Sequence, residues 1–332
     1  MSGDKIVWAV AVCGGIVLAT EPLTIALLRR LAVFDVPGRR SSHSVPTPRG
    51  GGLPIVLGLV AAALIAPGTG HAGPALAAAI GYFGLLGLLD DLGSLPVLSR
   101  LAFQATGAAA VASMLVLPGR EPAFAVAVMV AAVALWLVGF VNAFNFMDGV
   151  NGISGAHALI GGVAYACLSG WRRDGFGVAA GLALAAGACA FLPWNALRAR
   201  VFLGDVGSYA IGAALAVLAA RLVILGVSAD AVAGPVALYL ADVAWTLQRR
   251  MRCGEQWLEA HRTHVYQRWC DAGWSHAEVT VLTSALTVLL CLLGVLGLHG
   301  GIAVRAAADF AGLAALAVYL RSPVLFRQLG EA

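Results

Sequence analysis

The chain has 332 residues, of which 60% are hydrophobic and only 11% are charged, and its mean hydropathy is +0.88. A soluble domain carries about 25% charged residues, so this composition excludes an ordinary soluble enzyme and predicts a polytopic membrane protein. The formal net charge of +4 is small and does not suggest a nucleic-acid partner.

The apolar runs are continuous rather than alternating, which predicts membrane-spanning helices and not the strands of a membrane barrel. We expect an all-α, polytopic helical bundle of about 10–11 transmembrane helices, folded as a single domain over residues 1–332. The candidate spans are residues 6–28, 52–66, 74–89, 101–117, 123–141, 152–170, 175–192, 206–225, 230–247, 277–298 and 302–320. The short ones would need a thinner bilayer or extra turns at their ends.

The distribution of basic residues predicts the orientation of these spans in the membrane. If the N-terminus lies outside, fifteen Lys and Arg residues fall on the cytoplasmic side and six on the outer side. The positive-inside rule therefore predicts an outer N-terminus and, with an odd number of spans, a cytoplasmic C-terminus. All five polar clusters then lie on the cytoplasmic side, which predicts one site there. The clusters are residues 35–49, 90–91, 142–151, 204–205 and 249–269.

The first cluster is a loop, because its prolines and glycines prevent a continuous helix. Arg40, His43 and Arg49 suit the binding of phosphate, and the run Gly50–Gly52 is expected to offer backbone N–H groups to an anion. The plainer alternative is a solvated basic loop that only follows the topology rule.

The second cluster is the pair Asp90-Asp91 at the end of the third span. Neighbouring carboxylates repel, so at least one of them needs a cation or a raised pKa. Magnesium chemistry on diphosphates uses such carboxylates. An acidic pair in solvent is the alternative, although the C-terminal end of a helix disfavours negative charge.

The third cluster together with Gly152, which follows it, holds three Asn, one Asp and two Gly between two long apolar runs. Polar residues are costly beside hydrocarbon, and a simple turn needs fewer of them. The fourth cluster places Asp205 at the start of the eighth span, where an N-cap is an ordinary role. Asp242, inside the ninth span, is a buried carboxylate and therefore a functional candidate.

The fifth cluster predicts a helix at the membrane surface over residues 255–269, with Trp257, His261, His264 and Arg268 on one face. The alternative for each histidine is a packing role. Cys253 and Cys270 could join the two histidines in a zinc site, but the spacing matches no common pattern.

Together these stretches resemble the bacterial polyprenyl-phosphate N-acetylhexosamine-1-phosphate transferases, the MraY/WecA family. The resemblance covers residues 35–268, and its specificity comes from five motifs in the family's order. The motifs are Arg40-Ser-Ser-His43-x-x-Pro-Thr-Pro-Arg49-x-Gly-Gly, Leu89-Asp-Asp91, Asn142-x-x-Asn145-x-x-Asp148-Gly, Phe202-Leu-Gly-Asp205-x-Gly-Ser208 and His261-Arg-Thr-His264-x-Tyr-Gln-Arg268.

The resemblance implies a reaction in the bacterial inner membrane. A UDP-N-acetylhexosamine would give its sugar 1-phosphate to undecaprenyl phosphate, with UMP as the second product. Magnesium, or manganese in its place, would be the cofactor. Membrane lipids would surround the multi-pass protein, its active site would face the cytoplasm, and a homodimer stays open.

The resemblance also implies roles for residues. Asp205 would hold the metal, while Asp90, Asp91 and Asp148 would be the catalytic carboxylates. Asp90 would deprotonate or orient the acceptor phosphate, and a covalent route with Asp90 or Asp148 as nucleophile stays open. The substrate-binding residues would be Arg40, His43, Arg49, Asn142, Asn145, Asn151, His261, Arg262 and His264.

Three departures from the family bear on the branch. Ser94 stands where the peptidoglycan branch has a lysine, the last loop has only His-x-x-His, and Asn151 stands where the family often has Asp. The first two favour the branch that starts O-antigen or other surface polysaccharides. The alternatives are the peptidoglycan-precursor phospho-MurNAc-pentapeptide transferase and a transporter or flippase, which only Asp242 and Glu21 support.

Overall fold

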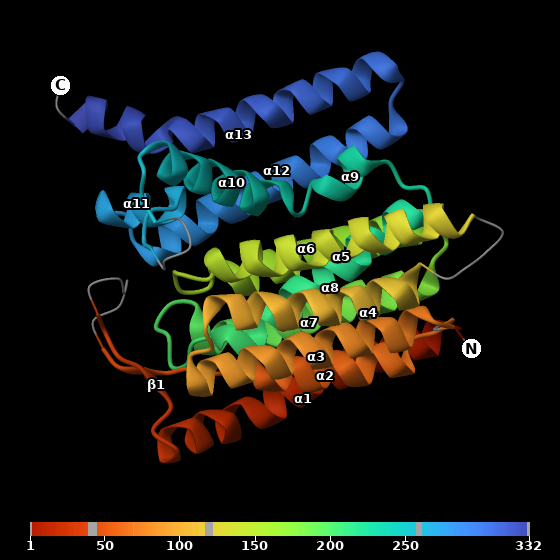
Figure 1. Ribbon diagram of the computed structural model, residues 1–332, viewed down its shortest axis with the longest axis horizontal. Helices are drawn as coiled ribbons and strands as arrows, with labels where there is room; N and C mark the ends of the chain where they lie inside the picture. The colour runs from red at the N-terminus through yellow and green to blue at the C-terminus, as the bar shows by residue number, and fades with distance from the viewer. Residues whose placement is uncertain (1, 39–44, 69, 117–121, 257–260, 331–332) are drawn as a thin grey trace.

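The computed structural model describes residues 2–38, 45–68, 70–116, 122–256 and 261–330. Within these residues it has thirteen α-helices and one short two-stranded sheet, and the long helices lie side by side as a bundle (Figure 1). The helices are α1 Ser2–Arg30, α2 Leu53–Ile65, α3 Ala72–Gly93, α4 Val97–Leu115, α5 Ala123–Phe146, α6 Ile153–Trp171, α7 Gly175–Asn195, α8 Gly204–Ile224, α9 Ala229–Ala233, α10 Ala237–Arg252, α11 Val265–Asp271, α12 His276–His299 and α13 Ile302–Gly330.

Ten of the eleven predicted spans coincide with one continuous helix each, so the predicted polytopic all-α fold is confirmed. Eight helices in the described residues are long and apolar enough to cross a membrane, namely α1, α3, α5, α6, α7, α8, α12 and α13. The predicted ninth span is instead divided between α9 and α10. Pro235 lies in the break, and it has no N–H to donate to a helix.

Helix α8 is the centre of the bundle, because 83% of its most apolar stretch is buried. Two glycines bring neighbouring helices onto its first turn. A Cβ at Gly87 of α3 would overlap the backbone oxygen of Asp205, and one at Gly52 would overlap the backbone of Gly207. The start of α8 is therefore in direct contact with α3 and with the segment before α2.

Helix α1 begins and helix α13 ends at opposite ends of the bundle, as expected for an odd number of crossings (Figure 1). The described parts of all five polar clusters lie at one end, which we call the polar end. There β1 (Phe34–Asp35) pairs antiparallel with β2 (Thr47–Pro48), and Arg49 forms a single parallel bridge with Phe202. The first loop is thereby tied to the loop between α7 and α8.

The predicted surface helix over residues 255–269 is wrong. Among the described residues of this stretch, 255–256 and 261–269, only those of α11 are helical, and α11 begins at Val265. The side chain of Gln267 accepts a hydrogen bond from the backbone N–H of His264, and Asp242 accepts from the N–H of Val265. These contacts start the helix after His264, so His261 and Arg268 do not share one helix face. Trp257 lies outside the described residues.

Candidate active site

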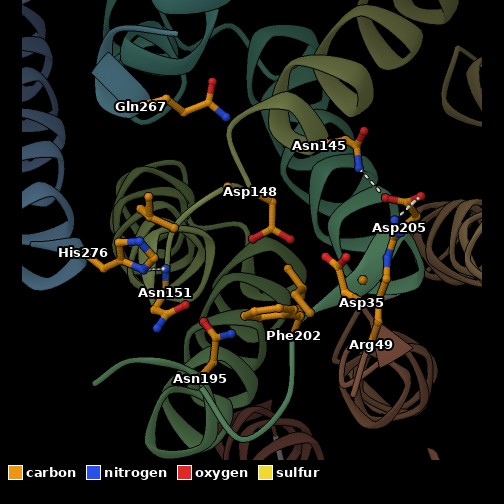
Figure 2. Close-up of a pocket in the computed structure, with 14 residues that line it drawn as sticks. Asp35, Arg49, Asn145, Asp148, Asn151, Asn195, Phe202, Asp205, Gln267 and His276 are labelled. Atoms are coloured by element: carbon orange, nitrogen blue, oxygen red, sulfur yellow. Dashed lines mark hydrogen bonds and ion pairs between the residues drawn. The ribbon is translucent and has the colours of Figure 1, made fainter. Parts of the chain in front are cut away.

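A cavity of about 310 Å³ opens at the polar end (Figure 2). It collects side chains from the first loop, the end of α5, the α5–α6 loop, the end of α7, the α7–α8 loop, the start of α8, α11 and α12. The lining residues are Asp35, Arg49, Asn145, Asp148, Gly149, Val150, Asn151, Asn195, Phe202, Leu203, Gly204, Asp205, Gln267 and His276.

Arg49 bridges two of the predicted carboxylates. Its Nε lies 2.6 Å from Oδ1 of Asp91, and its Nη2 lies 2.7 Å from Oδ2 of Asp205. Burial lowers the pKa of the guanidinium, but the carboxylates of Asp205, Asp91 and Asp35 outweigh burial and raise it above its usual value. Arg49 is therefore a permanent cation between two acidic residues.

Asp91, and not Asp205, caps helix α8. The backbone N–H groups of Asp205 and Val206 donate to the two carboxylate oxygens of Asp91, each over 2.9 Å. A carboxylate is favourable at this position because the N-terminus of a helix is positive. The ordinary capping role, which was the alternative for Asp205, is thus wrong, and Asp205 lines the cavity instead.

Asn145 links the third cluster to the fourth. Its Nδ2 donates to Oδ1 of Asp205 over 2.8 Å and to Oγ of Ser208 over 2.9 Å. Both oxygens of Asp205 consequently have a donor, one from Asn145 and one from Arg49. Asn145 of α5 therefore contacts two residues at the start of α8, Asp205 and Ser208.

Asp148 faces the same cavity from the α5–α6 loop, as Figure 2 shows. Burial in the surrounding protein raises the pKa of its carboxyl to about 6, and the nearby charge of Asp205 adds to this effect. A carboxyl with this pKa is ionised at neutral pH and still able to exchange a proton.

Asn151 is held from two sides at the rim of the cavity. Its backbone N–H donates to Nδ1 of His276 over 3.3 Å, and its carbonyl oxygen accepts from Thr280 over 2.9 Å. The next residue, Gly152, has φ +83° and donates its N–H to Oδ1 of Asn195 over 2.7 Å. These contacts fix the backbone and leave the amide side chain of Asn151 beside the cavity.

Asp90 and Asn142 do not line this cavity. The carboxylate of Asp90 accepts hydrogen bonds from Arg100, Tyr209 and the N–H of Leu95, over 3.0, 2.9 and 2.8 Å. The amide of Asn142 donates to the side chain of Gln104 over 2.6 Å. Asp90 therefore lies behind the site, next to Asp91, with its oxygens already engaged.

The glycine run after Arg49 does not present its N–H groups to an anion. The N–H groups of Gly50 and Gly51 donate to the carbonyl oxygen of Phe202, and that of Gly52 donates to Leu203. The expected backbone anion site is therefore wrong. The run serves close contact between chain segments instead. Arg40 and His43 lie outside the described residues.

The histidines of the fifth cluster lie beside the cavity rather than in its wall. His264 is 2% exposed, and its Nδ1 lies 3.0 Å from Asp242. Burial, with the neighbouring His264 and two arginines, lowers the pKa of His261 to about 4, so this imidazole is neutral at pH 7. Arg262 pairs with Asp271 over 2.9 Å.

Sequence reasoning missed several lining residues: Asp35, Asn195, Phe202, Gln267 and His276. Asn195 and His276 are single polar residues at helix ends, a position that many unrelated residues share. Their position next to apolar runs on the predicted cytoplasmic side was the only available signal. Phe202 and Gln267 were inside quoted motifs, but nothing separated them from packing residues.

The donor set fits a hard divalent cation that keeps water and substrate ligands. Asp148 and Asp205 present carboxylates to one cavity, and magnesium prefers oxygen ligands and takes few of them from protein. Among the described residues no three His, Cys, Asp or Glu side chains are close enough to hold a metal by themselves. Substrate phosphate would have to complete the shell. The same finding gives no support to a zinc site at Cys253 and Cys270.

Comparison with known proteins supplies independent information. The family model for glycosyl transferase family 4 matches residues 74–223, which contain Asp90, Asp91, Asp148 and Asp205. A decaprenyl-phosphate N-acetylglucosaminephosphotransferase of Mycobacterium tuberculosis is 32% identical over 308 residues, which cover 80% of this chain and 75% of the relative.

Two other relatives carry different names. A phospho-N-acetylmuramoyl-pentapeptide-transferase of Heliobacterium modesticaldum is 29% identical over 323 residues, which cover 88% of this chain and 98% of the relative. A probable undecaprenyl-phosphate N-acetylglucosaminyl 1-phosphate transferase of Bacillus subtilis is 27% identical, with 78% of this chain and 76% of the relative aligned.

Proposed function

Because the chain belongs to glycosyl transferase family 4, the family of MraY- and WecA-like phosphotransferases, we propose that it transfers an N-acetylhexosamine 1-phosphate from a UDP-sugar to undecaprenyl phosphate. A phosphate oxygen of the lipid attacks the phosphorus that carries the sugar, and the bond from that phosphorus to UMP breaks. The observation that carries the proposal is the cavity where Arg49, Asp148 and Asp205 meet at the polar end.

Both substrates are anions, so bringing them together costs electrostatic free energy. Arg49 lies in the cavity wall and supplies one fixed positive charge there. Magnesium, when bound by Asp205 with substrate phosphate, would offset the charge on the transferred phosphoryl group. Stabilising charge at preorganised positions is the largest contribution that such a site makes.

Asp148 is our candidate for handling the proton of the lipid phosphate. The second pKa of a phosphate monoester is about 6, close to the raised pKa of Asp148, about 6. Matched values favour proton transfer between the two groups. A covalent route with Asp148 as nucleophile uses the same placement. Asp90, with three hydrogen-bond donors on its carboxylate, would orient Arg100 and Tyr209 rather than attack.

The uncharged polar groups of the cavity suit the nucleotide sugar. Asn151 and Gln267 offer amides, Phe202 offers an aromatic face, and the amides of Asn145 and Asn195 line the cavity while bonded to other protein groups. For the lipid tail we propose a separate apolar cavity. This open cavity, about 400 Å³ in volume, is lined by parts of α5, α8, α9 and α10, toward the other end of the bundle.

The sugar and the pathway are the finer part of the proposal. The mycobacterial and Bacillus relatives carry N-acetylglucosamine in their names, which supports this sugar. The start of a cell-surface polysaccharide such as O-antigen is the role that we propose with it. The second candidate is the pentapeptide transferase of peptidoglycan synthesis, because that relative aligns over almost its whole length. A transporter is less favoured, since the bridged carboxylates gather at one end.

The test is release of UMP by the purified protein with magnesium, undecaprenyl phosphate and a panel of UDP-sugars. We expect UMP to appear with a UDP-N-acetylhexosamine and only when the prenyl phosphate is present. Release with UDP-MurNAc-pentapeptide alone would select the second candidate. Absence of prenyl-phosphate-dependent UMP with every donor would exclude both.

A further inference from the structure

Asp242 is a fully buried carboxylate of α10 that the proposed reaction does not use. Its exposed fraction is 0%, yet its two oxygens receive hydrogen bonds from three different helices. The donors are Thr246 over 3.1 Å, His264 over 3.0 Å, the N–H of Val265 over 3.1 Å, the N–H of Tyr266 over 3.4 Å, and the hydroxyl of Tyr319 over 2.6 Å.

These donors join the start of α11 to the last helix of the chain. The N–H groups of Val265 and Tyr266 are unpaired donors of a helix N-terminus, and Asp242 satisfies both. Tyr319 reaches the same carboxylate from α13. A second contact follows one turn later, where Nε1 of Trp269 donates to Ser322 over 2.7 Å. Helix α11 is therefore bonded to neighbouring helices at two points, Asp242 of α10 and Ser322 of α13.

The opposite side of α11 faces the candidate active site. The hydroxyl of Tyr266 donates to the carbonyl oxygen of Phe146 over 3.0 Å, directly before the loop that carries Asp148. Gln267 lines the cavity. A Cβ at Gly149 would overlap the Tyr266 hydroxyl and lie 2.9 Å from Nε2 of Gln267. Helix α11 thus packs against the α5–α6 loop so closely that a side chain at Gly149 would not fit.

We propose that Asp242 and Tyr319 are positioning residues, which set the placement of α11 and through it the position of Gln267 in the site for the nucleotide sugar. The proposal rests on the function proposed above. Neither residue touches the cavity, so each acts through α11. His264 belongs to the same unit, since its ring is held by Asp242 and is buried away from the cavity.

A purely structural role would leave substrate binding unchanged once the protein is folded. An apolar junction of similar volume often holds helices as well as a buried charge does. A carboxylate with five donors constrains α11 more than an apolar contact does. Its hydrogen bonds fix how α11 is rotated about its axis and how far it is shifted along it. The placement of one amide, Gln267, depends on both.

The experiment uses Tyr319→Phe, which removes a single hydroxyl and keeps the ring packed against Trp269. We expect the KM for the UDP-sugar to rise about five- to tenfold, with kcat and the KM for undecaprenyl phosphate within about twofold of the wild type. The matched control is Tyr165→Phe, which removes another buried hydroxyl, bonded to Val232 and remote from α11. It should leave all three constants unchanged.

A double-variant cycle with Gln267→Ala tests whether Tyr319 affects the donor KM through Gln267 or through a general loss of rigidity in the protein. If Tyr319 acts through Gln267, the double variant has a donor KM no higher than Gln267→Ala alone. Additive effects, a donor KM equal to that of the control, or a rise only in the KM for the lipid would each overturn the proposal.

Hydrogen exchange on the substrate-free protein keeps the test independent of the reaction. Tyr319→Phe should speed exchange of the amides in Val265–Asp271 several-fold, and Tyr165→Phe should not. A wild type that transfers no sugar phosphate would remove the proposed function. Unchanged exchange in Tyr319→Phe would remove the positioning role whatever the reaction is.

Discussion

Arg49 makes the most exacting contact of the site, because two carboxylates from different helices share one guanidinium. A lysine carries the same charge but has one nitrogen and no planar fork. We expect Arg49→Lys to lose about ten- to a hundredfold in kcat/KM while keeping the fold, and Arg49→Gln to lose more. Steady-state kinetics on the two purified variants provide the comparison. Equal activity of Arg49→Lys and wild type would show that only the charge matters.

Asp205 is the residue on which we expect magnesium to depend most. Asp205→Asn keeps the size of the side chain and its contact with Asn145 but removes the charge. We expect transfer to fall at least a hundredfold, about 2.7 kcal/mol of transition-state stabilisation, and the remaining activity to need more magnesium. A magnesium titration of initial rates measures this. Near-normal turnover at ordinary magnesium would show that Asp205 is not a metal ligand.

Removing the charge of Asp148 should slow the reaction but raise the thermal stability of the protein at neutral pH. Its raised pKa, about 6, means that the folded protein holds the proton more tightly than the unfolded chain does. The ionised carboxylate therefore costs stability above about pH 6, and this cost disappears below pH 4. Asp148→Asn should have a higher Tm than the wild type at pH 7.5 but not at pH 4, and at least a hundredfold lower kcat.

Asn151 provides the contrast to Asp148 within one loop. Its backbone is fixed by His276 and Thr280, whereas its side chain supplies no charge. Asn151→Ala should raise the KM for the donor more than it lowers kcat, in the same assay that silences Asp148→Asn. Comparable inactivity of the two variants would place the amide among the groups that act on the reacting phosphates.

At the scale of helices, the contact between α3 and α8 places Asp91 on the end of α8. A methyl group at Gly87 would overlap the backbone of Asp205, while Gly81, on the same helix, has nothing within 4 Å of its Cβ position. Gly87→Ala should therefore lower folded yield and Tm sharply or abolish activity, because the cap and the Arg49 bridge separate. Gly81→Ala should behave as the wild type in thermal melts and transfer assays.

The sequence predicts most elements of this fold for a simple reason. Continuous apolar runs leave little choice but helices, so the predicted spans and the observed helices agree. The two failures have different causes: Pro235 lies in the break that divides the ninth span, whereas a distant side chain decides where α11 begins. Helix α11 starts at Val265 because Asp242 of another helix satisfies its first N–H groups. No pattern of spacing within residues 255–269 contains that information.

The candidate site shows the same division. Clusters of several polar residues, such as Asn145 and Asp148, could be predicted because hydrocarbon makes them costly. Single residues such as Asn195 and His276 could not, since one polar residue at a helix end is ordinary. Taken alone, the glycine run after Arg49 indicates an anion site. Its N–H groups instead donate to the carbonyl oxygens of Phe202 and Leu203, about 150 residues away in the sequence.

At the scale of the whole molecule, the excess of basic residues predicts that the polar end faces the cytoplasm. Single cysteines in a cysteine-free background test this, because the loops at the two ends are exposed. A cysteine at Leu197, which is 86% exposed at the polar end, should be shielded from an impermeant thiol reagent in intact cells. A cysteine at Gly301, exposed at the other end, should react. The reverse pattern would invert the orientation.

The bridge from Arg49 to Asp91 and Asp205 also has a consequence for biosynthesis. Asp205 follows Asp91 by 114 residues, and at about 5–20 residues per second a ribosome takes about 6–23 s to make that stretch. During this interval Arg49 and Asp91 are already synthesised while α8 is still missing. Their mutual pairing would shield both charges while the nascent chain waits. Insertion of α8 would then complete the acidic centre, which gives the enzyme a late and well-defined moment of assembly.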